Sequence, residues 1–280
     1  MDQHEKDTDY FASMTDMMVG VLFVFVIMIA YFAFQITEQE SVPKQIYDEV
    51  VAENEKLKKE IEKLKRPNPL EVYINRGTEV RDEIVSQIIK ELKSEGIDAR
   101  SVQNGVVTIS GKDMFATGRS DLESVEGALD RVATIAKILA NRSACYSATA
   151  ENNSFYESCN PERLFLEAIF VEGHTDDVQI GGELPDGSRN NLELSARRAT
   201  NTYAHMVQEV PDLQNFKNPY DQQTLSVAAY GEQRPIADNS TRKGRSENRR
   251  IDIRFVMYVP KSKDDLKKVV ERHGGLVELN

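Results

Sequence analysis

An uncharged apolar stretch near the N-terminus constrains this 280-residue chain more than any other feature. Residues 17–37 carry no charged side chain, and about 20 apolar residues are enough for an α-helix to cross a bilayer. Within residues 11–37, Asp16 is the only charged residue. A carboxylate there costs free energy unless it has a partner or carries an ion. We therefore expect a membrane helix over residues 11–37 and take Asp16 as a functional candidate, with an interfacial anchor as the alternative.

The flanks of this stretch predict a retained signal anchor. The leader, residues 1–10, is acidic, and no small-x-small cleavage pattern follows the apolar run. The lysine-rich downstream flank gives the positive-inside rule no support for a cytoplasmic leader. A short leader is nevertheless easier to leave in the cytoplasm than a whole domain. We therefore expect a single-pass protein with a cytoplasmic N-terminus and an exported C-terminal part.

The two cysteines support export. Cys145 and Cys159 lie in one polar stretch and are the only cysteines of the chain. A pair that closes a short loop in an otherwise cysteine-free chain suggests a disulfide in an oxidising compartment. Two free surface thiols are the alternative.

Composition and motifs argue against several functions. A net charge of −11 argues against a general nucleic-acid binder. The sequence has no Gly-rich phosphate loop and no Cys/His cluster with metal-ligand spacing. It also lacks a recognisable catalytic constellation. We therefore expect no metal, no catalytic residues and no enzymatic activity.

Residues 38–66 form a charged segment with an apolar stripe. Its members recur at heptad spacing, which predicts a helix that dimerises in parallel. They are Tyr47, Val50, Asn54, Leu57, Ile61 and Leu64. A solvated helix with a narrow apolar face is the alternative. Pro67 and Pro69 are expected to end this helix.

Beyond this linker, strand and helix patterns alternate, which predicts an α+β domain with a mixed sheet packed against helices. Apolar residues at helical spacing predict helices over residues 78–94, 122–140 and 191–209. Strand-like runs lie at residues 70–74, 97–102, 106–110, 164–172, 225–230 and 250–258. The second and third runs meet across Asn104-Gly105, a hairpin signal. A polar helix is expected over residues 261–272.

Three polar blocks carry a family resemblance. The first is Gly173-His174-Thr175-Asp176, and the second is NLELSARRA at residues 191–199. The third is GEQRPIADN at residues 231–239, followed by GRSENRR at residues 244–250. In their order and spacing these blocks closely resemble the OmpA-like peptidoglycan-binding domain, over about residues 104–258. The run MFATG at residues 114–118 fits the first strand-to-loop corner of that family.

The resemblance implies a site for the diaminopimelate part of peptidoglycan. It implies that Asp176 holds the ligand ammonium and Arg198 a ligand carboxylate, which a guanidinium can grip through two parallel hydrogen bonds. Thr117, Gly118 and Asn191 would supply neighbouring polar contacts.

Other positions in these blocks carry different expectations. Arg249 is assigned to the site, with a structural role as the alternative. Leu194 and Ala199 are expected in the core. Asn248 is expected to brace a corner, and His174 to be a hydrogen-bonded corner residue. The long charged segment between Asp176 and Asn191 is expected to form a flap beside the ligand.

The whole layout resembles the B-type stator subunits, of which the flagellar motor's B subunit is the familiar member. Residues 16–27 also resemble the ion-motor helix of the ExbD and TolR proteins. The resemblance implies a homodimer inside a ring of five multi-span A subunits in the bacterial inner membrane, with the C-terminal domain in the periplasm. Asp16 would take up and release H⁺ or Na⁺, with Thr15 and Ser13 as candidate helpers. No cofactor is expected beyond the transported ion.

Among these motors the layout looks closest to the B subunit of the Zorya anti-phage system. The leader is acidic, and Asp16 follows the Met14-Thr15 pair, whereas in flagellar subunits the acid precedes an aromatic-Met-Thr run. This resemblance implies a motor that senses envelope perturbation and signals indirectly to cytoplasmic effectors. A flagellar-type stator and a non-motor wall tether are the alternatives.

The expected organisation is therefore a cytoplasmic leader at residues 1–10, a membrane helix at 11–37 and a helical dimerisation linker at 38–66. The OmpA-like domain follows at residues 70–260, with a C-terminal tail helix within 261–280.

Overall fold

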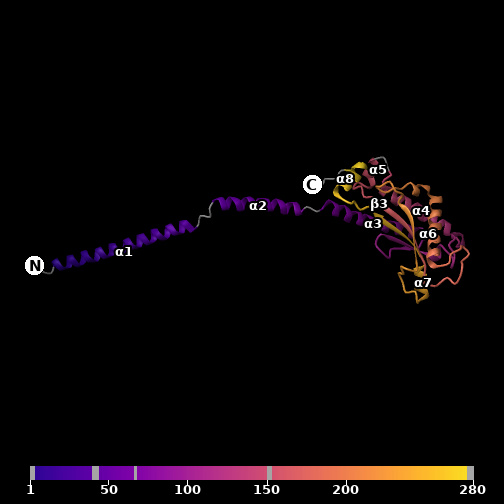
Figure 1. Ribbon diagram of the computed structural model, residues 1–280, viewed down its shortest axis with the longest axis horizontal. Coiled ribbons are helices and arrows are strands. Elements are labelled where there is room, and N and C mark those ends of the chain that lie inside the picture. Colours follow the sequence, from indigo (N-terminus) through magenta and orange to yellow (C-terminus); the bar gives the residue numbers. More distant parts are fainter. Residues whose placement is uncertain (1–3, 40–43, 66–67, 150–152, 276–280) are drawn as a thin grey trace. The chain divides into compact units, whose positions relative to one another are not determined.

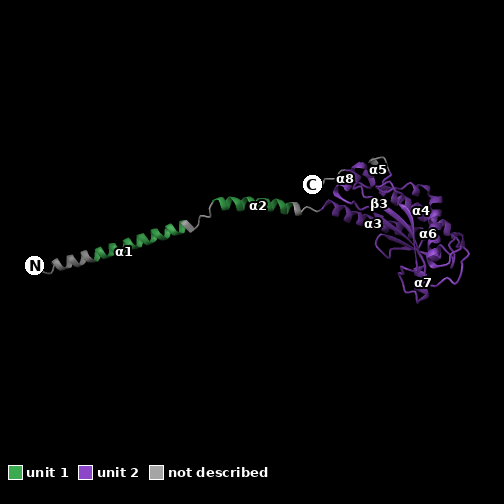
Figure 2. Cartoon of the chain, in the orientation of Figure 1, with its two compact units in different colours: residues 1–67 green, residues 68–280 purple. Residues whose placement is uncertain are grey.

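The computed structural model describes residues 4–39, 44–65, 68–149 and 153–275 (Figure 1). The chain divides into two compact units, residues 1–67 and residues 68–280 (Figure 2). Each unit is described by itself.

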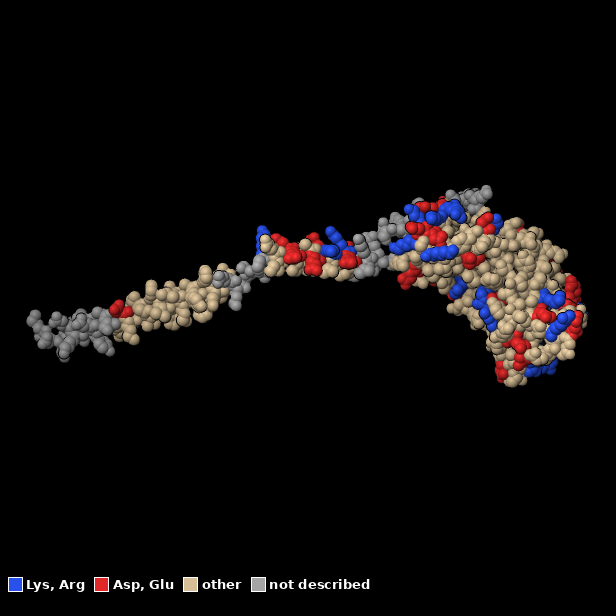
Figure 3. Space-filling model, viewed as in Figure 1, with Lys and Arg blue, Asp and Glu red and all other residues tan. Residues whose placement is uncertain are grey.

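The first unit consists of two helices, α1 (His4–Gln39) and α2 (Lys44–Lys65). Within α1, residues Met14–Thr37 are long and apolar enough to cross a membrane, which agrees with the expected span. Their apolar side chains are exposed, and Figure 3 shows a stretch of α1 without Lys, Arg, Asp or Glu. An apolar, outward-facing surface of this length is suited to a lipid environment.

The stripe expected on the linker lies on α2 and is exposed. Tyr47, Val50, Leu57 and Ile61 are each about half exposed or more. The side chain of Leu64 lies outside the described residues. The exposed stripe is available for a partner, and the parallel dimer remains a prediction.

The second unit is built on a mixed five-stranded sheet of order β1-β2-β5-β3-β4. Strands β3 and β4 are parallel and the other pairs are antiparallel. Val171 on β3 lies opposite Val227 of β4 on one side and Ile253 of β5 on the other. The strands are β1 (Ala99–Arg100), β2 (Val106–Ser110), β3 (Leu166–His174), β4 (Leu225–Gly231) and β5 (Arg250–Met257).

Helices pack against this sheet and complete the core. Helix α6 (Asn191–Glu209) packs on β3 and β4, α3 (Pro69–Ser94) packs on β5, and α4 (Ala128–Ser143) packs on both α3 and α6. Alternate strand residues meet these helices, as the two-residue period of a strand requires. They include Val107, Ile109, Ile169, Val171, Ile251, Ile253 and Phe255. The remaining helices are α5 (Asn153–Cys159), α7 (Arg242–Asn248) and α8 (Lys263–Arg272). The α+β prediction is confirmed.

The strand expected at residues 70–74 is wrong, because these residues form the first turns of α3. Asn68 caps the helix by accepting a hydrogen bond from the Leu70 N–H, and Pro69 occupies the first helical turn, where its missing N–H is tolerated. Tyr73 then continues the buried face of the helix and donates its hydroxyl to the Arg163 carbonyl at 2.8 Å.

The helix expected over residues 122–140 is interrupted. A 3₁₀ turn (Leu122–Ser124) precedes α4, and Gly127 separates them with a φ of 73°. A positive φ favours glycine, so the chain turns here before the helix starts. The hairpin across Asn104-Gly105 is confirmed, although its first strand is only the two residues of β1. The C-terminal helix is also confirmed and buries Leu266, Val269 and Val270.

The expected disulfide joins Cys145 to Cys159. The loop it closes is tied further by Asn160, whose amide donates to the Cys145 carbonyl at 3.0 Å and to the Leu164 carbonyl at 2.8 Å. The next turn holds Arg163, a fully buried residue whose guanidinium donates to the carbonyls of His273 and Gly274. The disulfide loop therefore supports the segment that holds the end of α8.

Because this disulfide closes a loop with a sequence separation of 14, we expect its loss to lower the free energy of unfolding by about 3 kcal/mol. The comparison is between the double variant Cys145→Ser/Cys159→Ser and the unmodified chain, unfolded in urea in detergent and followed by circular dichroism. Ser158→Ala, an exposed change in the same loop, is the control and should leave stability unchanged. Equal stability of oxidised and reduced protein would contradict this role.

Candidate functional site

The site begins where β3 ends. Gly173 lies so close to α6 that a Cβ built on it would be 2.1 Å from the Ser195 carbonyl oxygen, so only glycine fits. Two residues after β3 ends at His174 comes Asp176, which is 8% exposed. Its Oδ2 accepts a hydrogen bond from Arg249 Nη1 at 2.5 Å, and its Oδ1 accepts one from the Val178 N–H. The Asp176 carboxylate is therefore held just beyond β3, between the Arg249 guanidinium and the main chain of Val178.

Arg198 projects from α6, and its charge is buried. The residue is 3% exposed, and its Nε and Nη2 donate to the carbonyls of Arg119 and Ala116 at 2.9 and 3.3 Å. Its guanidinium carbon lies 5.3 Å from the centre of the Phe115 ring. Burial, followed by the nearby charge of Arg249, lowers the pKa of Arg198 to about 10. Asp176 and Asp186 are close enough for their charges to oppose this lowering, but among the described residues Arg198 hydrogen-bonds only to main-chain carbonyls.

These two charges line one cavity of about 420 Å³. Every residue that the sequence assigned to wall binding lies on its wall: Thr117, Gly118, Asp176, Asn191, Arg198 and Arg249. Three separate sequence blocks and the 114–118 corner thus meet at one place. Arg249 also lines this cavity, and its ion pair with Asp176 partly neutralises that carboxylate.

The segment after Asp176 forms one side of the cavity, as expected of a flap. Its residues 178–184 line the cavity. Asn191 donates its amide to the Val178 carbonyl at 3.0 Å and to the Glu232 carboxylate at 2.5 Å, while Gln179 also donates to Glu232. Asn191 therefore uses its amide N–H groups to fasten the flap, which leaves its carbonyl oxygen as the group that a ligand could contact.

Sequence reasoning missed two residues of this site. Glu232 is the acceptor that fastens the flap. Arg245 lines the cavity from α7 and donates through Nη1 to the carbonyls of Asn239 and Ser240. The signal for Arg245 was its spacing, because residues four apart share one face of a helix and Arg249 follows it by one turn. Leu194, expected in the core, is buried but also contributes apolar surface to the cavity.

Asn248 has the expected structural role. It is fully buried, its Oδ1 accepts hydrogen bonds from the Ile236 and Ala237 N–H groups, and its amide donates to the Ala237 carbonyl. Ala199 lies in the core as expected.

His174 belongs to an ionic network on the other side of the sheet. Its Nε2 lies 3.2 Å from Asp252 Oδ2, and its ring stacks on Tyr230. His174, Glu172 and Asp252 have donor atoms close enough to surround a metal ion. Both carboxylates are already paired: Glu172 with Arg254 at 2.7 Å and Asp252 with Arg250 at 2.9 Å. The cluster is therefore balanced by arginines of the protein itself.

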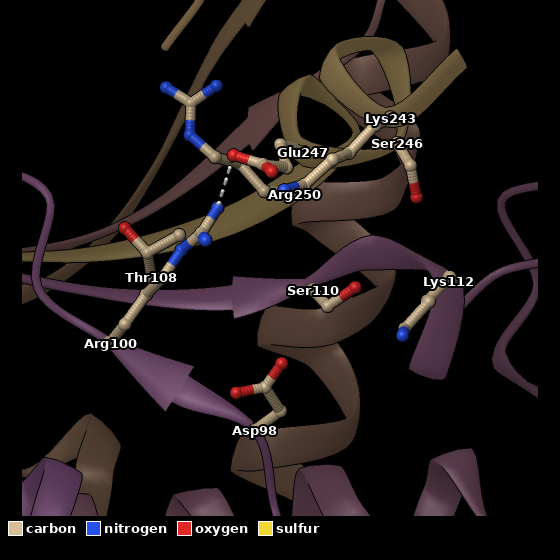
Figure 4. Close-up of a pocket in the computed structure, with 9 residues that line it drawn as sticks. All are labelled: Asp98, Arg100, Thr108, Ser110, Lys112, Lys243, Ser246, Glu247 and Arg250. Atoms are coloured by element: carbon tan, nitrogen blue, oxygen red, sulfur yellow. Dashed lines mark hydrogen bonds and ion pairs between the residues drawn. The ribbon is translucent and has the colours of Figure 1, made fainter. Parts of the chain in front are cut away.

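A second cavity, of about 250 Å³, lies at the end of β2 beside α7 (Figure 4). In Figure 4, Arg100 reaches toward Glu247, and the two form an ion pair at 3.3 Å. Lys112, Lys243 and Asp98 also line it. It contains none of the residues assigned to wall binding. The Asp176 cavity is therefore the site that the motif blocks define.

The ion candidate Asp16 lies in the first unit, near the start of the Met14–Thr37 span, and its side chain is exposed. Gly20 follows one turn later, and apart from the adjoining backbone of α1 no described residue has a heavy atom within 4 Å of the position its Cβ would take. A small residue there lets a neighbouring helix approach closely. Thr15 lies beside Asp16 on α1, while the side chain of Ser13 lies outside the described residues.

Comparison with known proteins agrees with the motif blocks. Residues 147–249 match the model of the OmpA family. Over 85 residues the chain is 35% identical to Motility protein B of Bacillus subtilis, covering 30% of this chain and 28% of that protein. Over 91 residues it is 34% identical to Outer membrane protein A of Bordetella avium, covering 32% and 39%. The chain thus spans less than half the length of these curated relatives.

A search of solved structures matched a putative MotB-like protein from Desulfovibrio vulgaris, with a TM-score of 0.45 and 22% identity over 68% of this chain and 99% of that one. Another match is the cell wall anchor of the type VI secretion system (T6SS) from Pseudomonas aeruginosa, with a TM-score of 0.40 and 18% identity over 61% and 95%. By its match to the OmpA family model over residues 147–249, the second unit of this chain contains an OmpA-like domain, and it follows in sequence an apolar helix long enough to cross a membrane.

Proposed function

We propose that this chain is the B subunit of an ion-driven membrane motor, with its C-terminal domain anchored to peptidoglycan. The observation that carries the proposal is the cavity that joins the Asp176 carboxylate to the buried guanidinium of Arg198. The proposed role is mechanical and not enzymatic. The protein would lie in the bacterial inner membrane with a cytoplasmic leader and a periplasmic domain.

Wall binding follows from the charges in the cavity. A buried charge without an opposite charge costs free energy, and among the described residues Arg198 donates only to main-chain carbonyls. A ligand carboxylate would neutralise it. Asp176 lies in the same cavity and can accept a hydrogen bond from an ammonium. An amino-acid end with one ammonium and one carboxylate fits this pair, and the free end of diaminopimelate has both groups.

The motor role rests on Asp16. Protonation or Na⁺ binding would remove the cost of placing its charge in a membrane, and release would restore that cost. Alternation between the two states would change which contacts with a surrounding pentamer of A subunits are stable. A homodimer joined by the α2 stripe would sit within this ring. Such a ring can do mechanical work only if one of its parts is held stationary. Binding of the C-terminal domain to the cell wall would hold the B-subunit dimer in place.

The kind of motor is a narrower question. The acidic leader and the position of Asp16 after Met14-Thr15 favour the anti-phage Zorya motor, which would sense envelope perturbation and signal to cytoplasmic effectors. Similarity to Motility protein B favours the alternative, a flagellar-type stator. Neighbouring genes would separate them: a helicase or nuclease gene supports defence, and flagellar genes support the stator.

Removing either charge of the wall site should weaken binding to purified peptidoglycan. We expect Asp176→Asn and Arg198→Gln each to reduce binding at least tenfold, because a hydrogen bond between charged groups contributes about 1.5–3 kcal/mol. Co-sedimentation with purified sacculi measures this for the full chain in detergent. The matched controls are the exposed neighbours, Asp177→Asn and Arg197→Gln, which should bind normally. Undiminished binding by both site variants would rule out this cavity as the wall site.

Replacing Asp16 by asparagine should stop ion flow without preventing assembly. Asparagine has nearly the same size but cannot alternate between charged and neutral states, so we expect ion flux in proteoliposomes to fall to background. Co-purification with the A subunit should be unchanged. Full flux through the Asp16→Asn protein would leave a non-motor tether as the function.

A further inference from the structure

Three guanidiniums line the cavity, those of Arg198, Arg245 and Arg249, together with the carboxylates of Asp176 and Glu183. The carboxylate of Glu232 lies next to the wall, where it accepts hydrogen bonds from Asn191 and Gln179. An amino-acid end with one ammonium and one carboxylate offers a single carboxylate to these guanidiniums. A ligand with a second carboxylate could engage one more of them.

The ion pairs of these groups show which guanidiniums lack a carboxylate partner. Asp176 pairs with Arg249 at 2.5 Å, and Glu183 lies 3.4 Å from Arg189, which is not part of the cavity wall. Arg198 and Arg245 donate only to main-chain carbonyls among the described residues. Two guanidiniums of the wall therefore have no carboxylate partner.

An ammonium bound at Asp176 gives the other guanidiniums no carboxylate partner. Oδ2 of Asp176 is occupied by Arg249, and among the described residues Oδ1 accepts only the Val178 N–H at 3.2 Å, so Oδ1 is where an ammonium can bind. Arg198 and Arg245 then still donate only to main-chain carbonyls among these residues. Giving each of them a carboxylate takes a ligand with one ammonium and two carboxylates.

We propose that the cavity selects stem peptides that end at diaminopimelate with both carboxylates free, and this inference rests on the proposed wall binding. In such a tripeptide stem, the terminal residue carries a free ammonium, the carboxylate beside it and the C-terminal carboxylate. Arg198 holds the carboxylate beside the ammonium, and Arg245 holds the C-terminal one. The enzyme that supplies this ligand is a peptidase that hydrolyses the amide bond after diaminopimelate.

A tetrapeptide stem is the sharpest comparison because it has the same net charge. Its diaminopimelate C-terminal carboxyl is consumed in an amide bond, and the free carboxylate lies one residue further on, about 3.5 Å away in an extended chain. In a tripeptide stem amidated at the diaminopimelate C-terminus, an uncharged amide replaces the second carboxylate. The tetrapeptide therefore tests where the second carboxylate must lie, and the amidated tripeptide tests whether it is needed.

Isothermal titration of the full chain in detergent tests this with three soluble disaccharide peptides: the tripeptide, the tetrapeptide and the amidated tripeptide. We expect the unmodified tripeptide to bind about tenfold more tightly than either of the others, a difference of about 1.4 kcal/mol. Equal affinity for all three would overturn the selectivity while leaving wall binding intact. Binding of none would overturn the proposed wall function and the selectivity together.

The variant Arg245→Gln tests whether Arg245 binds the second carboxylate. In this variant the affinity for the tripeptide should fall to that for the tetrapeptide, and tetrapeptide affinity should stay within about twofold of its original value. Arg242→Gln, an exposed change on the same helix and outside the cavity wall, should preserve the tenfold preference. An unchanged preference in Arg245→Gln would overturn the assignment.

Salt gives a second measurement that needs no variant. Partly exposed charges are screened at high ionic strength, so the tripeptide preference of the unmodified protein should narrow between about 50 mM and about 500 mM salt. A preference independent of salt would show that shape, and not charge, selects the ligand, and would overturn the proposal.

Discussion

The close approach of helix α6 to the end of strand β3 is the constraint on which the candidate site depends. Gly173 leaves no room for a side chain against the Ser195 carbonyl, and the Ser195 hydroxyl accepts a hydrogen bond from the Gly231 N–H at 2.9 Å. Gly231 in turn accepts from the Thr175 N–H at 2.9 Å. This contact fixes the chain just before Asp176 against the helix that carries Arg198. A bulkier residue at position 173 would separate the two charges.

The same packing creates the electrostatic property that the function would use. Arg198 is buried where α6 meets the 115–119 corner, and the described residues give its guanidinium carbonyl oxygens as hydrogen-bond acceptors but no carboxylate. A charge in that state binds an anion more strongly than an exposed arginine does, because water competes less for it. The cavity therefore favours ligands with acidic groups, and a stem peptide of peptidoglycan carries several carboxylates.

Much of this arrangement was predictable from the sequence, and the failures have physical causes. The motif blocks and the 114–118 run supplied the six candidate residues that line the cavity, because their order and spacing are specific. Residues 70–74 were misassigned because a short apolar run fits a strand or a buried helix equally well. Glu232 was missed because its role depends on how the flap folds back onto it, which no local pattern specifies. Arg245 was missed although its spacing of four residues from Arg249 was a signal. The disulfide was predictable because the chain has only two cysteines.

A crystal structure of the protein with a bound disaccharide tripeptide would test the central claim most directly. The account predicts that the ligand occupies the Asp176 cavity, with its ammonium within hydrogen-bond distance of Asp176 and a carboxylate within hydrogen-bond distance of Arg198. A ligand bound in the second cavity, between Arg100 and Lys112, would contradict it. So would a ligand in the Asp176 cavity with both of these charged residues still unengaged.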